Sequence, residues 1–172
     1  VHSMEGKKRA KLISVLSQQK SPGVLTVRAL VYHGRFPYLG YPRRYTDEDR
    51  QIVEEAMQTA GVSEFADESL SELSGGQQQK AYIAMLIAQN TKIVYMDEPV
   101  TFLDINYQLE LMNLIKRMQK SGKTVIMIIH DLNLAMTYSD RIMAMKDGRL
   151  LSMGTPKEIY EKGVLGELFG IE

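Results

Sequence analysis

"KIVYMDEP", residues 92–99, places two carboxylates directly after a short continuous apolar run. The run has the length and composition of a buried strand, and "TVIMII" (124–129) is a second run of the same kind. The segment between them has apolar residues at helical spacing, namely Ile105, Leu109, Met112 and Ile115. A strand, a helix and a buried second strand on this scale predict two parallel strands joined by a right-handed crossover. The stretch therefore indicates an α/β fold built on a parallel sheet.

Upstream of this unit the sequence predicts one more strand and two helices. "KLISVLSQQ" (11–19) reads as a short buried strand that ends in polar residues. Thr46 with Asp49 forms a capping-box pattern, and Gly61 stops the apolar residues that follow at helical spacing, which predicts an amphipathic helix. Residues 81–88 are apolar on most faces, which is typical of a helix buried against a sheet.

Less regular patterns occur before and after these elements. The aromatic stretch "VYHGRFPYLGYPRRY" (31–45) contains two glycines and two prolines, and predicts a loop or a broken helix. Near the C-terminal end, Asp147 and Gly148 stand between two alternating runs and predict a hairpin. Thr155, followed by Pro156 and Glu158, predicts the start of a last helix.

The composition is that of an ordinary globular protein, and it excludes several kinds of site. Of the 172 residues, 44% are hydrophobic and 24% are charged, which is enough to bury a sizeable core. Basic and acidic residues number 21 each, so no overall field attracts nucleic acid, and no nucleic-acid partner is expected. The absence of cysteine excludes disulfides and thiolate metal sites. All apolar runs are strand-sized, so no membrane span is predicted.

Three residues at the ends of the predicted strands are candidates for chemistry. Asp97 and Glu98 follow the first strand, at the edge where open parallel sheets bind ligands. Asp97 can bind a hydrated magnesium ion, and Glu98 can accept a proton from an attacking water, although an acidic turn that ends a strand is the simpler alternative. His130 follows the second strand and is expected at the same edge, either in a structural role or as a donor to a transferring phosphoryl group.

The pentapeptide "LSGGQ" (73–77) predicts an anion-binding helix start. The first amide groups of a helix lack partners, Gly75 and Gly76 have no side chain to block the approach of an anion, and Ser74 can also contact it. The alternative is a flexible glycine turn before a helix. A pentapeptide this specific favours phosphate binding.

A loop for holding nucleotide phosphates, which ends in Gly-Lys-Ser or Gly-Lys-Thr, is missing from the sequence. "SGKT" (121–124) fails because Arg117 stands where the pattern needs glycine, and because the segment ends a helix and begins a strand. "EGKK" (5–8) fails because Val1 and Lys8 stand at two required positions. Since the first residue is also not methionine, we expect the chain to be a fragment.

Taken together, the motifs resemble the ATP-binding cassette (ABC) ATPases, in the order typical of that family and over essentially the whole chain. The subgroup that the chain resembles comprises the ATPase subunits of iron-siderophore, haem and cobalamin importers. This finer resemblance rests on three stretches: "YHGRFPYLG" (32–40), "TFLDINYQLE" (101–110) and "HDLNLAMTYSDRIMAMKDGRLLSMGTP" (130–156). The chain departs from the family at Gln78 and Lys80, which replace common arginines, and at Met85, where an arginine is frequent.

The resemblance implies a partial P-loop NTPase (RecA-like) core, an α/β fold with a parallel sheet, into which a helical signature subdomain is inserted. Residues 1–19 would end the N-terminal part of the core, residues 20–90 would form the helical subdomain, and residues 91–172 would form the C-terminal part of the core. That last part would carry the Walker B strand, the D-loop, the switch histidine, the hairpin and the final helices.

The resemblance also implies roles for individual residues, with ATP and Mg²⁺ as ligands. Glu98 and His130 would be catalytic, and Asp97 and the Q-loop residue Gln18 would bind the metal. The expected nucleotide-binding residues are those of the signature and the D-loop, namely Ser74, Gly75, Gly76, Gln77 and Asp104.

As partners, the resemblance implies a second ATPase subunit in a head-to-tail homodimer, and membrane permease subunits that dock on the helical subdomain. The protein would be peripheral, on the cytoplasmic face of the inner membrane, where it would power import of an iron-siderophore or a related metal chelate. The chain alone, without a phosphate loop, is expected to be inactive. Two alternatives remain: a naturally truncated interaction module without enzymatic activity, and a DNA-repair type of ABC ATPase.

Overall fold

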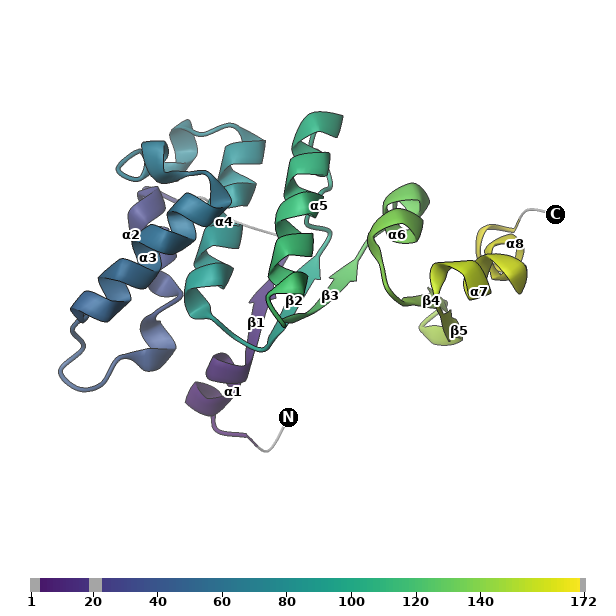
Figure 1. Cartoon of the computed structure of the whole chain (residues 1–172), viewed down its shortest axis with the longest axis horizontal. Helices are drawn as coiled ribbons and strands as arrows, with labels where there is room; N and C mark the ends of the chain where they lie inside the picture. Colours follow the sequence, from purple (N-terminus) through teal and green to yellow (C-terminus); the bar gives the residue numbers. More distant parts are fainter. Residues whose placement is uncertain (1–3, 19–22, 171–172) are drawn as a thin grey trace. The chain divides into compact units, whose positions relative to one another are not determined.

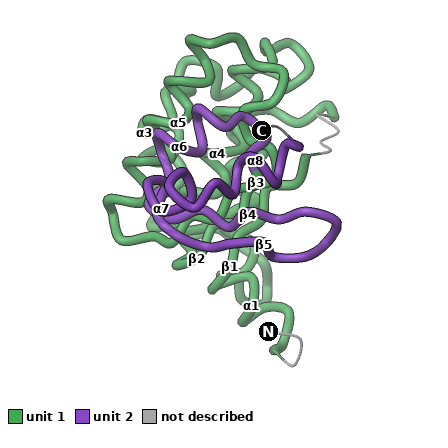
Figure 2. The backbone as a smooth tube through the Cα atoms, turned by 90° about the vertical axis from the view of Figure 1, so that its right-hand side faces the viewer, with its two compact units in different colours: residues 1–128 green, residues 129–172 purple. Residues whose placement is uncertain are grey.

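The structure, a computed structural model (Figure 1), describes residues 4–18 and 23–170. It divides the chain into two units, residues 1–128 and residues 129–172, which are coloured green and purple in Figure 2. The division into three segments expected above remains a prediction, and its first boundary falls within residues 19–22, which lie outside the described residues. No helix in the described part of the chain is both long enough and apolar enough to cross a membrane.

A parallel sheet lies at the centre of the first unit. Its strands are β1 (Ile13–Leu16), β2 (Ile93–Asp97) and β3 (Thr124–Ile128), in the order β1-β2-β3, and both pairings are parallel. Helix α5 (Ile105–Lys120) connects β2 to β3, which confirms the predicted strand, helix and strand. The sequence analysis thus placed the two apolar runs correctly in one parallel sheet.

Only one face of this sheet is well buried within the described residues. The buried side chains are Ser14, Leu16, Val94 and Met96. On the opposite face, Val15 is 57% exposed and Ile128 is 40% exposed. The prediction of a buried second strand was therefore wrong: a continuous apolar run is typical of a strand covered on both faces, whereas no described residue of this unit buries the face of β3 that carries Ile126 and Ile128.

Helix α5 is amphipathic, but only two of the four apolar residues predicted to form its buried face are buried. Met112 and Ile115 are buried, whereas Ile105 and Leu109 are exposed. The buried face of α5 is completed by Leu111, Leu114 and Met118, and α5 packs against β3. The first turns of α5 project beyond the sheet, so apolar residues there have no core to enter within this unit (Figure 1).

In the helical part of the first unit, α3 and α4 begin and end at the capping residues seen in the sequence. Helix α3 (Asp47–Ala60) begins with the predicted capping box and ends at Gly61, which has a positive φ of 69°. Helix α4 (Gly75–Gln89) ends at Asn90 in the left-handed conformation. The aromatic stretch is a broken helix, as expected. It comprises the end of α2 (Val27–His33) and a 3-10 turn, η1 (Phe36–Tyr38). The remaining short elements are α1 (Gly6–Leu12), η2 (Ser63–Phe65) and η3 (Leu70–Glu72).

A buried ion pair and its hydrogen bonds join helices α3 and α4 to the short turn η1. The Nε of Arg35 donates to Oδ1 of Asp49 at 2.8 Å, and both side chains are over nine-tenths buried. The Nη1 of Arg35 also donates to the carbonyl of Ala88, at the end of α4, at 2.8 Å. Its guanidinium lies over the ring of Tyr38, 4.0 Å from the ring centroid. Arg35 therefore ties α3 and η1 to the C-terminal end of α4.

We expect this ion pair to make stability depend on pH. Burial raises the pKa of Asp49, but hydrogen bonds from Thr46 and Arg35 outweigh burial and lower it below the ordinary value of 3.8. Because the folded pKa is the lower one, the stabilisation is present above the ordinary value and is lost as pH falls through the folded pKa. The difference in unfolding free energy between the wild type and Asp49→Asn should therefore shrink below about pH 4. A difference that stays constant down to pH 2, about two units below the ordinary pKa, would contradict this.

The second unit consists of a hairpin and three helices. Its elements are α6 (Leu132–Tyr138), β4 (Ile142–Lys146), β5 (Arg149–Gly154), α7 (Pro156–Glu161) and α8 (Val164–Phe169). The predicted turn is present, with Asp147 and Gly148 both at positive φ, and Thr155 forms its capping box with Glu158. The core of this unit is formed by Ala144, Ile159 and Val164.

Candidate nucleotide site

The two candidate carboxylates lie where the central strand ends. Asp97 is the last residue of β2, and the backbone amide of Glu98 donates to the carbonyl of Ile128 at 3.2 Å. Glu98 has a positive φ of 48°. Such a backbone is uncommon for a residue other than glycine, and strain of this kind clusters at functional sites. The chain therefore turns sharply just where Glu98 leaves the sheet.

Two side chains fix the carboxylate of Glu98. Its Oε2 accepts a hydrogen bond from Nε2 of Gln18 at 2.8 Å and another from the hydroxyl of Thr101 at 3.0 Å. Gln18 follows β1, the strand beside β2, so the parallel sheet brings together two residues that are 80 positions apart. The predicted metal ligand Gln18 thus contacts the predicted base, and its role toward a metal remains a prediction.

The segment from Glu98 to Asp104, here called the carboxylate loop, is held from both sides. Gln79 of α4 is buried and donates to the carbonyl of Pro99 at 2.6 Å. Gln108 of α5 donates to the carbonyl of Leu103 at 3.0 Å. The sequence analysis missed Gln79, Thr101 and Gln108. Polar residues on the core side of a helix are a signal that could have indicated the two glutamines, whereas Thr101 lies in the loop and gave no such signal.

Asp104, predicted to bind nucleotide, also has a local structural role. Its Oδ1 accepts hydrogen bonds from the amides of Asn106 and Tyr107, at 3.0 and 3.1 Å, and so caps α5. Cap residues of this kind stabilise a helix by about 1 kcal/mol. The carboxylate loop therefore ends in a fixed helix start.

The signature residues form the beginning of α4. The amide of Gln77 donates to Oγ of Ser74 at 3.3 Å, and Oε1 of Gln77 accepts from the amide of Ser74 at 2.8 Å. This is a capping box. Because the hydroxyl of Ser74 accepts in this bond, its proton can be donated to an anion in front of the helix.

The two glycines of the signature have different surroundings. A Cβ on Gly75 would meet no heavy atom within 4 Å in the part of the chain that the structure describes. Gly76 is buried, and a Cβ there would lie only 2.4 Å from Cδ1 of Tyr107. The space beside Gly75 is thus open, whereas the ring of Tyr107 occupies the place that a side chain at Gly76 would take. Anion binding by the amides of the two glycines remains a prediction.

His130 follows β3, as predicted, and is the second residue of the second unit. Its side chain is exposed and makes interactions within the protein. The two units are described separately, so a position of His130 opposite Glu98 remains a prediction.

Within residues 4–18 and 23–170, no group of three or more histidine or acidic side chains is placed so that it could hold a metal ion. The oxygens of Asp97 and Gln18 are nevertheless of the hard type that Mg²⁺ prefers. Magnesium in nucleotide sites is commonly bound by one or two such ligands together with phosphate oxygens. The residues present therefore fit Mg²⁺ that arrives with a nucleotide.

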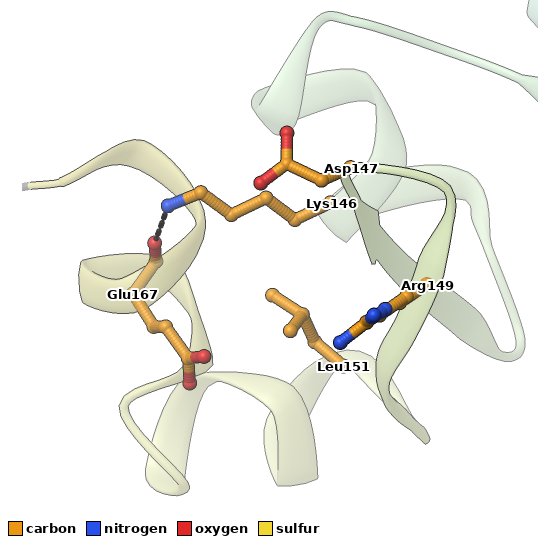
Figure 3. Close-up of a pocket in the computed structure, with 5 residues that line it drawn as sticks. All are labelled: Lys146, Asp147, Arg149, Leu151 and Glu167. Carbon is orange, nitrogen blue, oxygen red and sulfur yellow. Dashed lines mark hydrogen bonds between the residues drawn. The ribbon is translucent and has the colours of Figure 1, made fainter.

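A separate pocket in the second unit contains none of the predicted site residues (Figure 3). Its lining residues are Lys146, Asp147, Arg149, Leu151 and Glu167. The Nζ of Lys146 donates to the backbone carbonyl of Glu167 at 2.5 Å, which joins the hairpin to α8. Cations and acidic groups alternate around this pocket, and the lysine is used structurally.

The chain is similar in sequence to known proteins. A family profile described as "ABC transporter" matches residues 1–101. The chain is 40% identical to the iron(3+)-hydroxamate import ATP-binding protein of Bacillus subtilis, over 100% of this chain and 65% of that protein. The chain therefore spans slightly less than two thirds of the length of this relative.

Solved structures give the same result for the fold. A metal-chelate type ABC transporter in an inward-facing conformation matches with a TM-score of 0.85 and 25% identity, over 92% of this chain and 64% of the other. A dimeric bacterial ABC transporter cassette matches with a TM-score of 0.74 and 31% identity, over 87% of this chain and 65% of the other. These likenesses confirm the predicted fold class.

Proposed function

Because the chain belongs to the ABC transporter family, we propose that it forms part of the ATP-hydrolysing subunit of an importer for an iron-siderophore or a related metal chelate. One observation carries the enzymatic part of this proposal: the Gln18 amide and the Thr101 hydroxyl both hold the carboxylate of Glu98 where β2 ends. The cargo class rests on the similarity to the hydroxamate import protein and to the metal-chelate type transporter.

The proposed reaction is hydrolysis of ATP by an in-line water. Glu98 accepts a proton from the water while the water oxygen bonds to the γ-phosphorus, and the bond from that phosphorus to the bridging oxygen of ADP breaks. His130 donates a hydrogen bond to the transferring phosphoryl group. Asp97 and Gln18 would hold Mg²⁺, which neutralises charge on the phosphates.

The proposed arrangement is a head-to-tail pair of ATPase subunits. The signature residues Ser74, Gly75, Gly76 and Gln77 would face ATP that is held by the phosphate loop of the second subunit, with Asp104 beside it. The open space at Gly75 supports this, as does the similarity to a dimeric cassette. Phe102, in the carboxylate loop, is 97% exposed and Ile105, close to it in sequence, is 62% exposed, and this interface would cover both.

The ATPase would sit at the cytoplasmic face of the membrane through contact between its helical part and a permease. Tyr41 is fully exposed and Phe36 is half exposed, whereas the hydroxyl of Tyr38 donates to the carbonyl of Gln89 at 2.8 Å. The aromatic stretch thus contains one anchored ring, that of Tyr38, and one fully exposed ring, that of Tyr41, while the half-exposed Phe36 also contacts the ring of His33. Exposed aromatic residues of this kind are frequent binding hot spots.

Replacing Tyr41 with alanine should weaken assembly with the permease about tenfold or more and leave the ATPase subunit folded, because a hot-spot aromatic contributes at least 2 kcal/mol. Pull-down of the permease with the complete subunit measures this. Tyr160→Ala, at an exposed tyrosine of the second unit, is the matched control and should assemble normally. If the Tyr41 variant assembles as well as the control, the docking role of this stretch is wrong.

The direct test of the proposed function is ATP hydrolysis by the complete subunit assembled with its permease in vesicles. We expect turnover that depends on Mg²⁺ and rises when a binding protein loaded with an iron(III) hydroxamate is added. Turnover that is insensitive to the loaded binding protein would reject the importer assignment, and an assembled complex without hydrolysis would support a non-enzymatic module.

A further inference from the structure

We propose that Tyr107 is a positioning residue that couples the carboxylate loop to the signature helix α4, and that Gly76 is required because the Tyr107 ring occupies the space of its missing side chain. The catalytic consequence of this coupling rests on the proposed function, whereas the contact itself does not. The two signature glycines are thus needed for different reasons: Gly76 because a side chain would clash with Tyr107, and Gly75 because the space in front of it stays open.

The geometry at Gly76 is closed by the ring of Tyr107. A Cβ at this position would lie 2.4, 2.6 and 2.8 Å from Cδ1, Cγ and Cε1 of Tyr107. Carbon atoms in favourable contact are about 3.5–4.0 Å apart. Because Cγ is the root of the ring, a small movement of the ring tip would not relieve the clash. Any side chain at Gly76 must therefore displace the ring or the start of α4.

The ring is held in this place by its neighbours. The ammonium group of Lys80 lies over it, 5.2 Å from the ring centroid, within the range of a cation–π contact. Lys80 also forms an ion pair with Glu110 of α5, so this pair bridges the two helices beside the ring.

The backbone of Tyr107 connects the ring to the carboxylate loop. Its amide donates to Oδ1 of Asp104, the last residue of that loop, at 3.1 Å. One residue therefore contacts the signature helix through its ring and the loop through its amide. A displacement of the loop is passed directly to the start of α4, which is the surface proposed to face the nucleotide of the second subunit.

A double-substitution cycle tests this coupling in the complete subunit assembled with its permease. We expect Gly76→Ala to lower the kcat of ATP hydrolysis by about tenfold or more, because the added methyl group displaces the ring or the start of α4 from its place. Tyr107→Ala should lower kcat by itself, since the signature loses its support. In that background, adding Gly76→Ala should change kcat by less than about twofold, because the clash no longer exists. Tyr107→Phe should behave as the wild type, since no contact described here uses the hydroxyl.

Thermal unfolding gives a second readout that is independent of catalysis. Gly76→Ala should lower the unfolding midpoint in the wild type but not in the Tyr107→Ala background. Gly75→Ala, the matched control, should leave the midpoint unchanged or raise it slightly, because alanine favours the helix. Equal losses from Gly76→Ala in both backgrounds, in kcat and in the midpoint, would overturn the proposal. If the wild type itself does not hydrolyse ATP, the proposed function fails, and the unfolding cycle still decides whether the Tyr107 contact dictates the glycine.

Discussion

Replacement of Glu98 with glutamine is expected to slow ATP hydrolysis by about 10²- to 10⁴-fold in the complete subunit and to preserve ATP binding. The amide keeps the size of the carboxylate and can still accept the hydrogen bond from Gln18 or from Thr101. It cannot accept a proton from the attacking water, because an amide is not basic. Single-turnover hydrolysis and equilibrium ATP binding, measured on the same preparation, separate the chemical step from affinity.

The matched control is Glu68→Gln, which makes the same chemical change at an exposed glutamate of the helical part. This variant should hydrolyse ATP at the rate of the wild type. A Glu98→Gln subunit that turns over as fast as this control would remove Glu98 from the role of base. A variant that loses ATP binding as well would indicate a structural role for Glu98.

Replacement of Arg35 with methionine is expected to lower the free energy of unfolding by about 3–5 kcal/mol, because it leaves the buried carboxylate of Asp49 without its cation. The change also removes the donor to the carbonyl of Ala88 and the group that packs over Tyr38. Urea unfolding of the complete subunit, analysed with a common slope, measures the loss.

Two further variants separate the buried charge from general damage. Arg50→Met removes an arginine whose partner Asp47 is 97% exposed, and should cost less than about 1 kcal/mol. The double variant Arg35→Met with Asp49→Asn should be more stable than Arg35→Met alone, since no uncompensated charge remains. If the double variant is the less stable of the two, the buried charge is not the cause of the loss.

Local patterns predicted most of the secondary structure correctly. Thr46, Gly61 and the Asp147–Gly148 pair act within a few residues of themselves, so their effects can be read without knowledge of the fold. The burial of β3 was mispredicted for the opposite reason. An apolar run shows that a strand can be covered on both faces. Whether it is covered depends on how other segments pack against it, and the run itself holds no information about those segments.

The site shows the same distinction between local and long-range information. Asp97 and Glu98 were placed correctly at the end of β2, since a strand end is a local feature. The contact of Gln18 with Glu98 spans 80 positions, and the place of Tyr107 over Gly76 depends on the packing of α5 against α4. The sequence therefore could not show that the ring of Tyr107 lies where a side chain at Gly76 would be.

The central claim, that this chain belongs to the motor of a metal-chelate importer, is tested most directly by uptake of radioactive iron(III) hydroxamate into vesicles. The vesicles should contain the permease, the complete ATPase subunit and the binding protein. We predict uptake that requires ATP and that falls to the background level in the Glu98→Gln subunit. Uptake that continues with the Glu98→Gln subunit would contradict the claim. Hydrolysis of ATP by the wild type without any uptake of a metal chelate would contradict it as well.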